Sequence, residues 1–253
     1  ITTTDGKATL TAGTTIDSTA NGNITTTGQN SAAQGTAGGE VLLHSTGAGA
    51  ITLLGNITAN GGNTTAGVAN GGAAGVVTIL NDSGLIVIDD ITATGGTSFG
   101  GTAGANGTVQ LSATTTIGQQ PTTAITAGNL KLISTGGDIT LANTGNDVAI
   151  VAAALSGASS LSYVDANALS IGTVAAAGTG AAALGQVIGI AATGADETVT
   201  VTSLTNTLTV DDVVTTNSGD VTLLATTGAI VVDAAITTTD GKATLTAGTT
   251  IDS

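Results

Sequence analysis

The stretch ITTTDGKATLTAGTTIDS occupies residues 1–18 and returns, letter for letter, as residues 236–253. Eighteen identical positions are too many for chance, so the chain holds one unit of 235 residues and the opening of a second. Self-similarity at a fixed period is the signature of repeat architectures. We therefore expect residues 1–235 to form one repeat unit of a longer tandem array. Residues 236–253 should begin the next identical repeat and continue the same fold.

Within the repeated stretch, Gly6 opens a phrase of alternating residues, GKATL. The phrase returns as GEVLL (39–43), GVVTI (75–79), GTVQL (107–111), GNLKL (128–132) and GDVTL (219–223). Period-2 alternation bounded by Gly predicts a β-strand. We expect one inward column of Ala8, Val41, Val77, Val109, Leu130 and Val221, and a second of Leu10, Leu43, Ile79, Leu111, Leu132 and Leu223. The outward column between them holds Thr9, Leu42, Thr78, Gln110, Lys131 and Thr222.

Two further phrases follow each such strand. The second contains Ile16, Ile51 with Leu53, Ile86 with Ile88, and Ile230 with Val232. The third reads ITTT at 24, ITAN at 57, ITAT at 91, ITAG at 125 and ITTT at 236. Three short strands per coil predict an all-β triangular solenoid with about eight coils per unit, roughly 38 Å long at a strand spacing of about 4.8 Å. The coil boundaries are hardest to assign from the sequence in residues 143–218, where we place strands near Leu161–Val164 and Val187–Ile190.

Four inserts rich in small residues interrupt the succession of strands, at residues 28–38, 61–75, 95–107 and 178–185. All four follow a third strand, so we expect them at one corner of the coil. Solenoids tolerate insertions that are confined to one corner.

The composition excludes several classes of function. Seventeen acidic residues against three Lys give a net charge of −14, which argues against nucleic acid and against anionic lipid as partners. There is no Cys, and no apolar run is long enough to cross a membrane, so we expect no membrane insertion in this segment. Only one Tyr and one Phe are present, so small aliphatic side chains must form the core.

Together, the Gly-bounded VxL phrases, the ITAxGG phrases and the corner inserts resemble the right-handed parallel β-helix of filamentous-haemagglutinin-like proteins and other giant bacterial adhesins. The resemblance covers the whole chain. It implies a very long secreted or surface-bound stalk, and hence an extracellular or cell-surface location. We therefore expect a structural segment of a fibre, stalk or surface filament, with adhesion as a further expectation of the resemblance.

Candidate sites are few. His44, the only His, is expected on the surface. Asp89–Asp90 and Asp211–Asp212 are adjacent pairs at strand ends, and neighbouring residues on a strand point to opposite faces. A glycan-cleaving β-helix would need two carboxylates facing each other across a groove, so we expect no enzyme and no catalytic residues. No cofactor is expected, and no metal-ligand motif is present, although scattered Asp and Asn at turns could hold weak calcium.

The outward Thr residues of the third phrase form the main alternative. A ladder of Thr25, Thr58, Thr92, Thr126 and Thr237 would suit ice or another crystal surface. Tyr163 is expected to fill a wide spot in the core. Phe99 lies inside a corner insert, where it could contact a neighbouring molecule. The expected partners are adjacent repeats end to end, and neighbouring fibres through the inserts.

Overall fold

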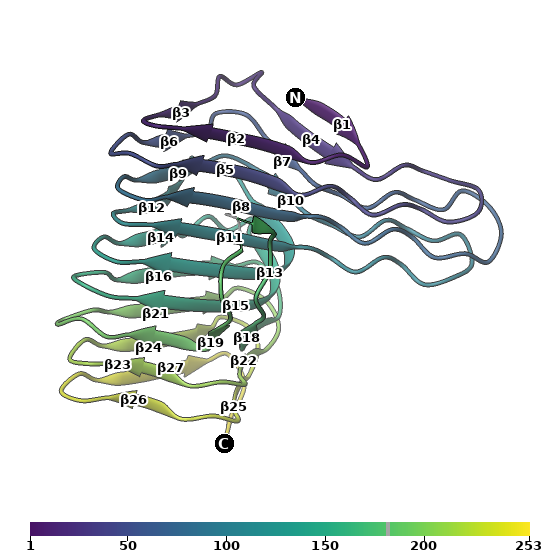
Figure 1. Ribbon diagram of the computed structural model, residues 1–253. Helices are drawn as coiled ribbons and strands as arrows, with labels where there is room; N and C mark the ends of the chain where they lie inside the picture. Colours follow the sequence, from purple (N-terminus) through teal and green to yellow (C-terminus); the bar gives the residue numbers. More distant parts are fainter. Residues whose placement is uncertain (181–182) are drawn as a thin grey trace.

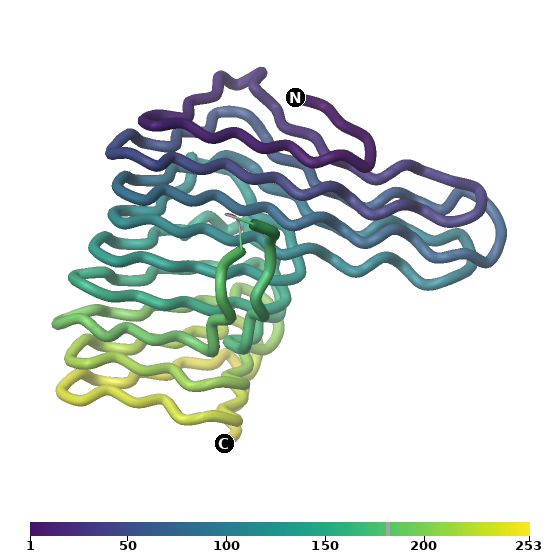
Figure 2. The backbone as a smooth tube through the Cα atoms, viewed as in Figure 1, coloured from purple at the N-terminus to yellow at the C-terminus, as the bar shows by residue number. Residues whose placement is uncertain are grey.

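The alternating sequence folds into short parallel strands stacked in three rows, as the computed structural model of residues 1–180 and 183–253 shows (Figure 1). The chain visits rows A, B and C in turn and then returns to row A beside its previous strand. The tube in Figure 2 follows this path from one end of the stack to the other. An all-β architecture of stacked parallel strands, as expected from the sequence, is confirmed.

In the described part of the chain, the three rows hold all strands except a two-stranded hairpin. Row A comprises β2 (Ala8–Ala12), β5 (Val41–Ser45), β8 (Val76–Asn81), β11 (Thr108–Ala113), the C-terminal parts of β13 (Ile125–Ser134) and β15 (Asp147–Leu155), β20 (Ile190–Ala192), β23 (Val214–Thr216) and β26 (Ile236–Thr238). Row B comprises β3 (Ile16–Asp17), β6 (Ile51–Thr52), β9 (Ile86–Ile88), β12 (Ile117–Gln119), β14 (Ile139–Leu141), β16 (Leu161–Asp165), β21 (Val199–Ser203), β24 (Val221–Ala225) and β27 (Ala243–Ala247). Row C comprises β1 (Thr2–Thr4), β4 (Ile24–Thr27), β7 (Ile57–Thr58), β10 (Ile91–Thr92), the N-terminal parts of β13 and β15, β17 (Leu169–Ile171), β22 (Leu208–Val210), β25 (Ile230–Val232) and β28 (Ile251–Asp252). Rows A and C join at one place: β17 pairs with Ile150 and Val151 of β15, whose other neighbours are Asn129 and Leu130 of row A, while β20 pairs with the last three residues of β15.

The core lies between the rows, where aliphatic side chains of like size stack on one another. In row A, for example, Leu43, Ile79, Leu111 and Leu132 are paired in register and have no exposed surface. Isoleucines of rows B and C stack in the same way: Ile51 pairs with Ile86, and Ile57 pairs with Ile91. Each side chain therefore finds its apolar neighbours in the coils before and after its own.

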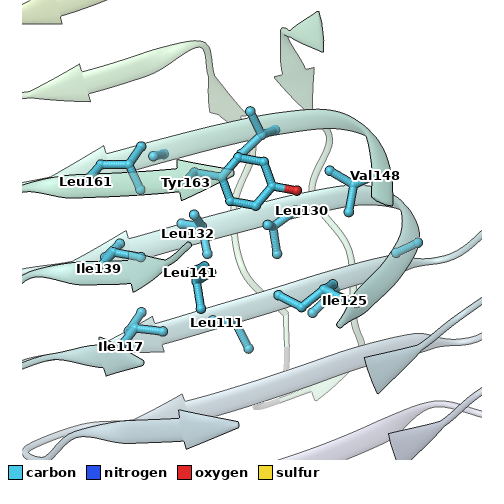
Figure 3. Packing of buried hydrophobic residues seen from close by; sticks show 14 of the residues in the cluster. Leu111, Ile117, Ile125, Leu130, Leu132, Ile139, Leu141, Val148, Leu161 and Tyr163 are labelled. Atoms are coloured by element: carbon cyan, nitrogen blue, oxygen red, sulfur yellow. The ribbon is translucent and has the colours of Figure 1, made fainter. Parts of the chain in front are cut away.

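One coil departs from this regular packing (Figure 3). Ala153 stands in row A where the neighbouring coil has Leu132, and in row B Tyr163 pairs with Leu141 and Val201. The Tyr163 ring is fully buried, and it occupies the coil that has lost the larger row A side chain. A large residue beside a small one keeps the core filled at constant volume. The expectation that Tyr163 faces inward is therefore confirmed.

The Tyr163 hydroxyl forms a hydrogen bond with a buried carboxylate. It donates to Asp165 Oδ2 over 2.7 Å, and Asp165 also accepts from the backbone N–H of Val148 and of Asn167. Burial raises the pKa of Asp165 in spite of these bonds, and burial together with the Asp165 charge raises the pKa of Tyr163 well above 10.0. The buried polar pair thus satisfies one backbone donor in β15, that of Val148, and one at the bend between β16 and β17, that of Asn167.

The order of strand lengths changes along the stack. Row A carries the long strands as far as β15, and row B carries them from β16 onward, because two long strands follow one another at residues 150–155 and 161–165. The expected columns are therefore wrong at their last members: Val221 and Leu223 lie in row B, and Ile230 with Val232 in row C. Val187, expected in a coil strand, instead lies in the hairpin of β18 (Thr173–Val174) and β19 (Val187–Ile188). Ile190 opens the coil strand β20.

The two copies of the repeated stretch consequently lie on different rows. Ala8 is in row A, paired with Val41, whereas its counterpart Ala243 is in row B, paired with Val221. Eight successive pairings lead along row A from β2 to β26, and β27 lies one row further. The 235-residue unit thus advances by eight circuits and one row.

Candidate functional site

The first three inserts leave the stack together and form a flat projection, the blade, made of residues 28–38, 61–75 and 95–107 (Figures 1 and 2). They depart after β4, β7 and β10 and return into β5, β8 and β11, so they project between rows C and A. Their arms form hardly any β-ladder. Instead each arm bonds to the arms around it, as in the bonds from Gly62 N to Thr36 O, from Gly72 N to Gly62 O and from Gly96 N to Gly72 O, all 2.8 Å.

Glycine makes this close packing of the blade arms feasible. A Cβ atom added at Gly72 would lie 1.8 Å from the carbonyl oxygen of Thr36, and one added at Gly104 would lie 1.8 Å from that of Gly72. Backbone therefore contacts backbone directly, as along the axis of the collagen triple helix, where only Gly fits. The Gly content of the inserts is a packing requirement of the blade.

The free edge of the blade exposes two large apolar side chains. Val68 is 85% exposed and Phe99 is 73% exposed. Gly100, the neighbour of Phe99, lies near Val68, since a Cβ atom added at Gly100 would lie 3.8 Å from Val68 Cα; the two apolar residues therefore belong to one edge. Phe99 is the only Phe of the chain, and it points to solvent.

The fourth insert behaves differently. Residues 172–180 and 183–189, which we call the strap, contain the β18–β19 hairpin and cross the outer side of row A along the stack (Figure 1). Residues 181–182 of the insert expected at 178–185 lie outside the described residues. Val174 and Val187 of the strap pack on Ile133, Ala152 and neighbouring apolar side chains of β13 and β15.

The strap covers most of the row A column that the sequence predicted to face solvent, although Thr9 is exposed as expected. Thr78, Gln110 and Lys131 have no exposed surface, and Leu42 is 8% exposed. The alternation itself is correct, since these side chains do point away from the core. They are buried because a second layer, contributed by a distant insert, covers them.

Lys131 holds the strap from beneath. Its Nζ donates to the carbonyl oxygens of Ala175 and Gly185 and to Gln110 Oε1, each over 2.8 Å. Gln110 in turn donates to Thr78 Oγ1 over 2.8 Å. Burial lowers the pKa of Lys131, because removal from water disfavours the charged amine.

The tip of the strap is held by a second Lys near the start of the chain. Thr179 donates through its backbone N–H and its hydroxyl to the two carboxylate oxygens of Glu40, over 2.9 Å and 2.7 Å. Lys7 Nζ lies 2.7 Å from Glu40 Oε2 and donates to Thr179 Oγ1. The pKa of Glu40 is lowered, because the bonds from Lys7 and Thr179 outweigh the effect of burial. The strap therefore links the sixth coil to the first two.

The threonines of the third phrase form a partial ladder. Thr25, Thr58, Thr92 and Thr126 pair in register along row C and are half-buried. Thr237 is not in the ladder, since it lies in row A opposite Thr215.

A polar groove of about 340 Å³ runs beside the ladder where row C meets the blade; it is lined by Thr27, Gly28, Asn30, Asn60, Gly61, Asn63, Thr94, Gly95 and Thr97. Its asparagines complete the hydrogen bonding of the next coil: Asn30 Oδ1 accepts from Asn63 N, and Asn63 Oδ1 accepts from Thr97 N. The blade therefore projects from the surface directly beside the Thr ladder and forms one side of this groove.

The remaining candidate residues serve local structure. His44 Nε2 lies 3.0 Å from Asp82 Oδ2, and Asp90 accepts from the backbone N–H of Ala124. Asp211 and Asp212 accept from the hydroxyls of Ser170 and Thr173.

In the described part of the chain, no three His, Asp or Glu side chains come together as metal ligands would. The same residues include no helix long and apolar enough to span a bilayer. Comparison with models of protein families, with curated proteins and with solved structures found no match.

Replacing Gly72 with Ala tests the packing of the blade. The new methyl group would lie 1.8 Å from Thr36 O, so the arms must separate. We expect fast hydrogen exchange in residues 28–38, 61–75 and 95–107, and a local loss of about 1–3 kcal/mol. Gly13→Ala is the matched control, because no atom lies within 4 Å of a Cβ at Gly13. Equal exchange in both variants would contradict the close packing of the arms.

Lys131→Met tests the strap. The variant leaves carbonyls of the strap without their donor, so we expect faster exchange in residues 173–188 and a loss of about 1–3 kcal/mol in stability. The pKa of Lys131 is lowered on folding, so between the folded and unfolded pKa values the unfolded chain binds more protons and stability rises with pH. The urea concentration at the midpoint of unfolding should therefore increase with pH, up to about pH 10.5, more in the natural chain than in the variant. Identical pH profiles would show that Lys131 is not buried by the strap.

Proposed function

We propose that this chain is a structural segment of a long extracellular or cell-surface filament, built as a right-handed, three-sided parallel β-helix of tandem units. It has no catalytic role and no resident cofactor in this proposal. Its partners are adjacent repeats of the same chain, end to end, and neighbouring filaments through the blade. The resemblance to filamentous-haemagglutinin-like proteins is the basis for the location, the handedness and an adhesive role.

The observation that carries the proposal is the stacking of residues 236–253. These residues repeat residues 1–18, and β26, β27 and β28 pair in register with β23, β24 and β25. The opening of the second unit thus extends the first stack instead of folding back over it. A stack that receives each new unit in this way grows along one axis.

The polar side chains support a mechanical role. The Asp pairs bond to nearby hydroxyls and backbone groups, and both Lys residues of the unit, Lys7 and Lys131, hold the strap. A strap that joins the first two coils to the sixth shares axial tension between coils that are otherwise linked only to their neighbours. The charge of −14 keeps such filaments apart in solution.

Electron microscopy of the native material tests this proposal. We expect thin, unbranched filaments many times longer than one unit, which spans about 40 Å at a strand spacing of about 4.8 Å. Leu43→Asp should remove them, because it buries an unpaired charge at a fully buried position. Thr9→Asp, an exposed position in the same row, is the control. Compact particles in the native material would contradict a filament.

Ice or crystal-surface binding is the second candidate, and the row C ladder is the observation that favours it. Thermal hysteresis of the native protein is the measurement. Since the blade stands beside the ladder and Asp147 follows Thr126 in the row, we expect no hysteresis. A measurable hysteresis that is abolished by Thr58→Tyr and Thr92→Tyr would make the ladder the functional surface instead.

A further inference from the structure

The repeated stretch keeps its own strand order but not its rows. Residues 2–4, 8–12 and 16–17 lie in rows C, A and B, whereas the strands of the second copy, 236–238, 243–247 and 251–252, belong to rows A, B and C. All three strands are displaced in the same direction by one row. Three separate sets of strand pairings therefore show the same displacement of the second copy by one row.

The cause of this advance lies inside the unit. The fifth coil has one long strand, in the C-terminal part of β13, while the sixth has two, at residues 150–155 and 161–165. Every phrase after that point falls one row later than its counterpart before it. The advance is thus built into residues 150–165 and recurs whenever the unit is repeated.

Nothing in the rows opposes the displacement. Ile236 stacks on Val214 in row A, and its counterpart Ile1 directly precedes β1, whose Thr2 pairs with Thr25 in row C. All rows offer the same environment to an inward aliphatic side chain, since Val214 in row A, Leu223 in row B and Ile230 in row C are each fully buried. A strand of the repeated stretch can therefore pack equally well in any row.

We infer that consecutive 235-residue units stack with a one-third turn between them, so that the blade and strap of each unit lie one side further round than those of the unit before. The inference rests on the proposed tandem filament with three sides. The surface that receives the next copy is the open edge of β26, β27 and β28. Three units, or 25 circuits, restore the starting orientation after about 120 Å.

The blades then follow a three-fold spiral. The exposed edge with Val68 and Phe99 faces a given side only once in about 120 Å, instead of once in about 40 Å as a single line of inserts would give. The strap of the second unit likewise lies over row B. Lys242, the counterpart of Lys7, directly precedes β27 in row B, one row beyond the row of Lys7. Its backbone N–H donates to Oδ1 of Asp220, the residue before β24.

A two-unit chain tests the rotation directly. Residues 19–253 are appended after Ser253, and Phe99 and its counterpart in the second unit are replaced by Cys for spin labelling, which is clean because the chain has no Cys. With an axial step of about 40 Å and a blade tip about 30 Å from the axis, a one-third turn places the labels about 65 Å apart. Without rotation they lie about 40 Å apart. A chain labelled in one unit only provides the background.

The outcomes separate the inference from the proposed function. A narrow distribution near 65 Å supports the rotation, whereas one near 40 Å, or a broad one from units that do not stack, overturns it. The two-unit chain answers this question whether or not the native material forms filaments, so compact native particles would contradict the filament alone.

A second measurement tests the row advance within one unit. Ala191→Cys and Thr215→Cys are neighbours in row A, so a short bifunctional thiol reagent should join them. Ala191→Cys with Thr222→Cys, in rows A and B, is the control that should not react. Failure of the first pair in a chain with the normal β-sheet circular dichroism would overturn the inference at its source.

Discussion

The in-register parallel pairing of each coil with the next is the constraint on which the structure depends. A single coil leaves every strand edge unpaired and its few aliphatic side chains half exposed, so stability comes from nearest neighbours. Register is therefore fixed wherever one face is buried, because a slip by one residue would move the whole aliphatic set outward. Even the exception obeys this rule, since Tyr163 enters the core in the coil where Ala153 leaves room for it.

The strap adds a long-range link to this local scheme. Lys7 and Thr179 are 172 residues apart, yet they meet at Glu40. In a chain of net charge −14, both cations of the unit are used to fix one hairpin, and Lys131 is buried there without a carboxylate partner. Carbonyl oxygens of the strap take that role. The strap thus depends on the stack beneath it, and it joins coils that do not touch one another.

Sequence reasoning succeeded where a side chain's environment follows from its immediate neighbours. The phrase around Leu43 was placed correctly as an inward strand, and so were the ITxx phrases that begin at Ile24, Ile57, Ile91 and Ile125. It failed at Gln110 and Lys131, because no local pattern shows that the strap returns to cover them. A signal was present: half of the fourth insert, GTGAAALG (178–185), is Ala and Leu, while the blade inserts consist mainly of Gly with Ala, Thr and Asn. An apolar insert requires a surface on which to pack.

The misplaced columns have a different cause. Phrases were aligned by likeness, which assumes that like phrases share a row, and Ala8 and Ala243 show that they do not. The sequence specifies only which strand follows which, and a strand's row depends on the number of strands before it. Because the rows present equivalent aliphatic surfaces, one added long strand displaces everything downstream by one row, and the ladder adjusts only at β15, where β17 pairs with Ile150 and Val151 and β20 with residues 153–155. Rotation along the stack is therefore set by strand count, which is a property of the whole unit and of no single residue in it.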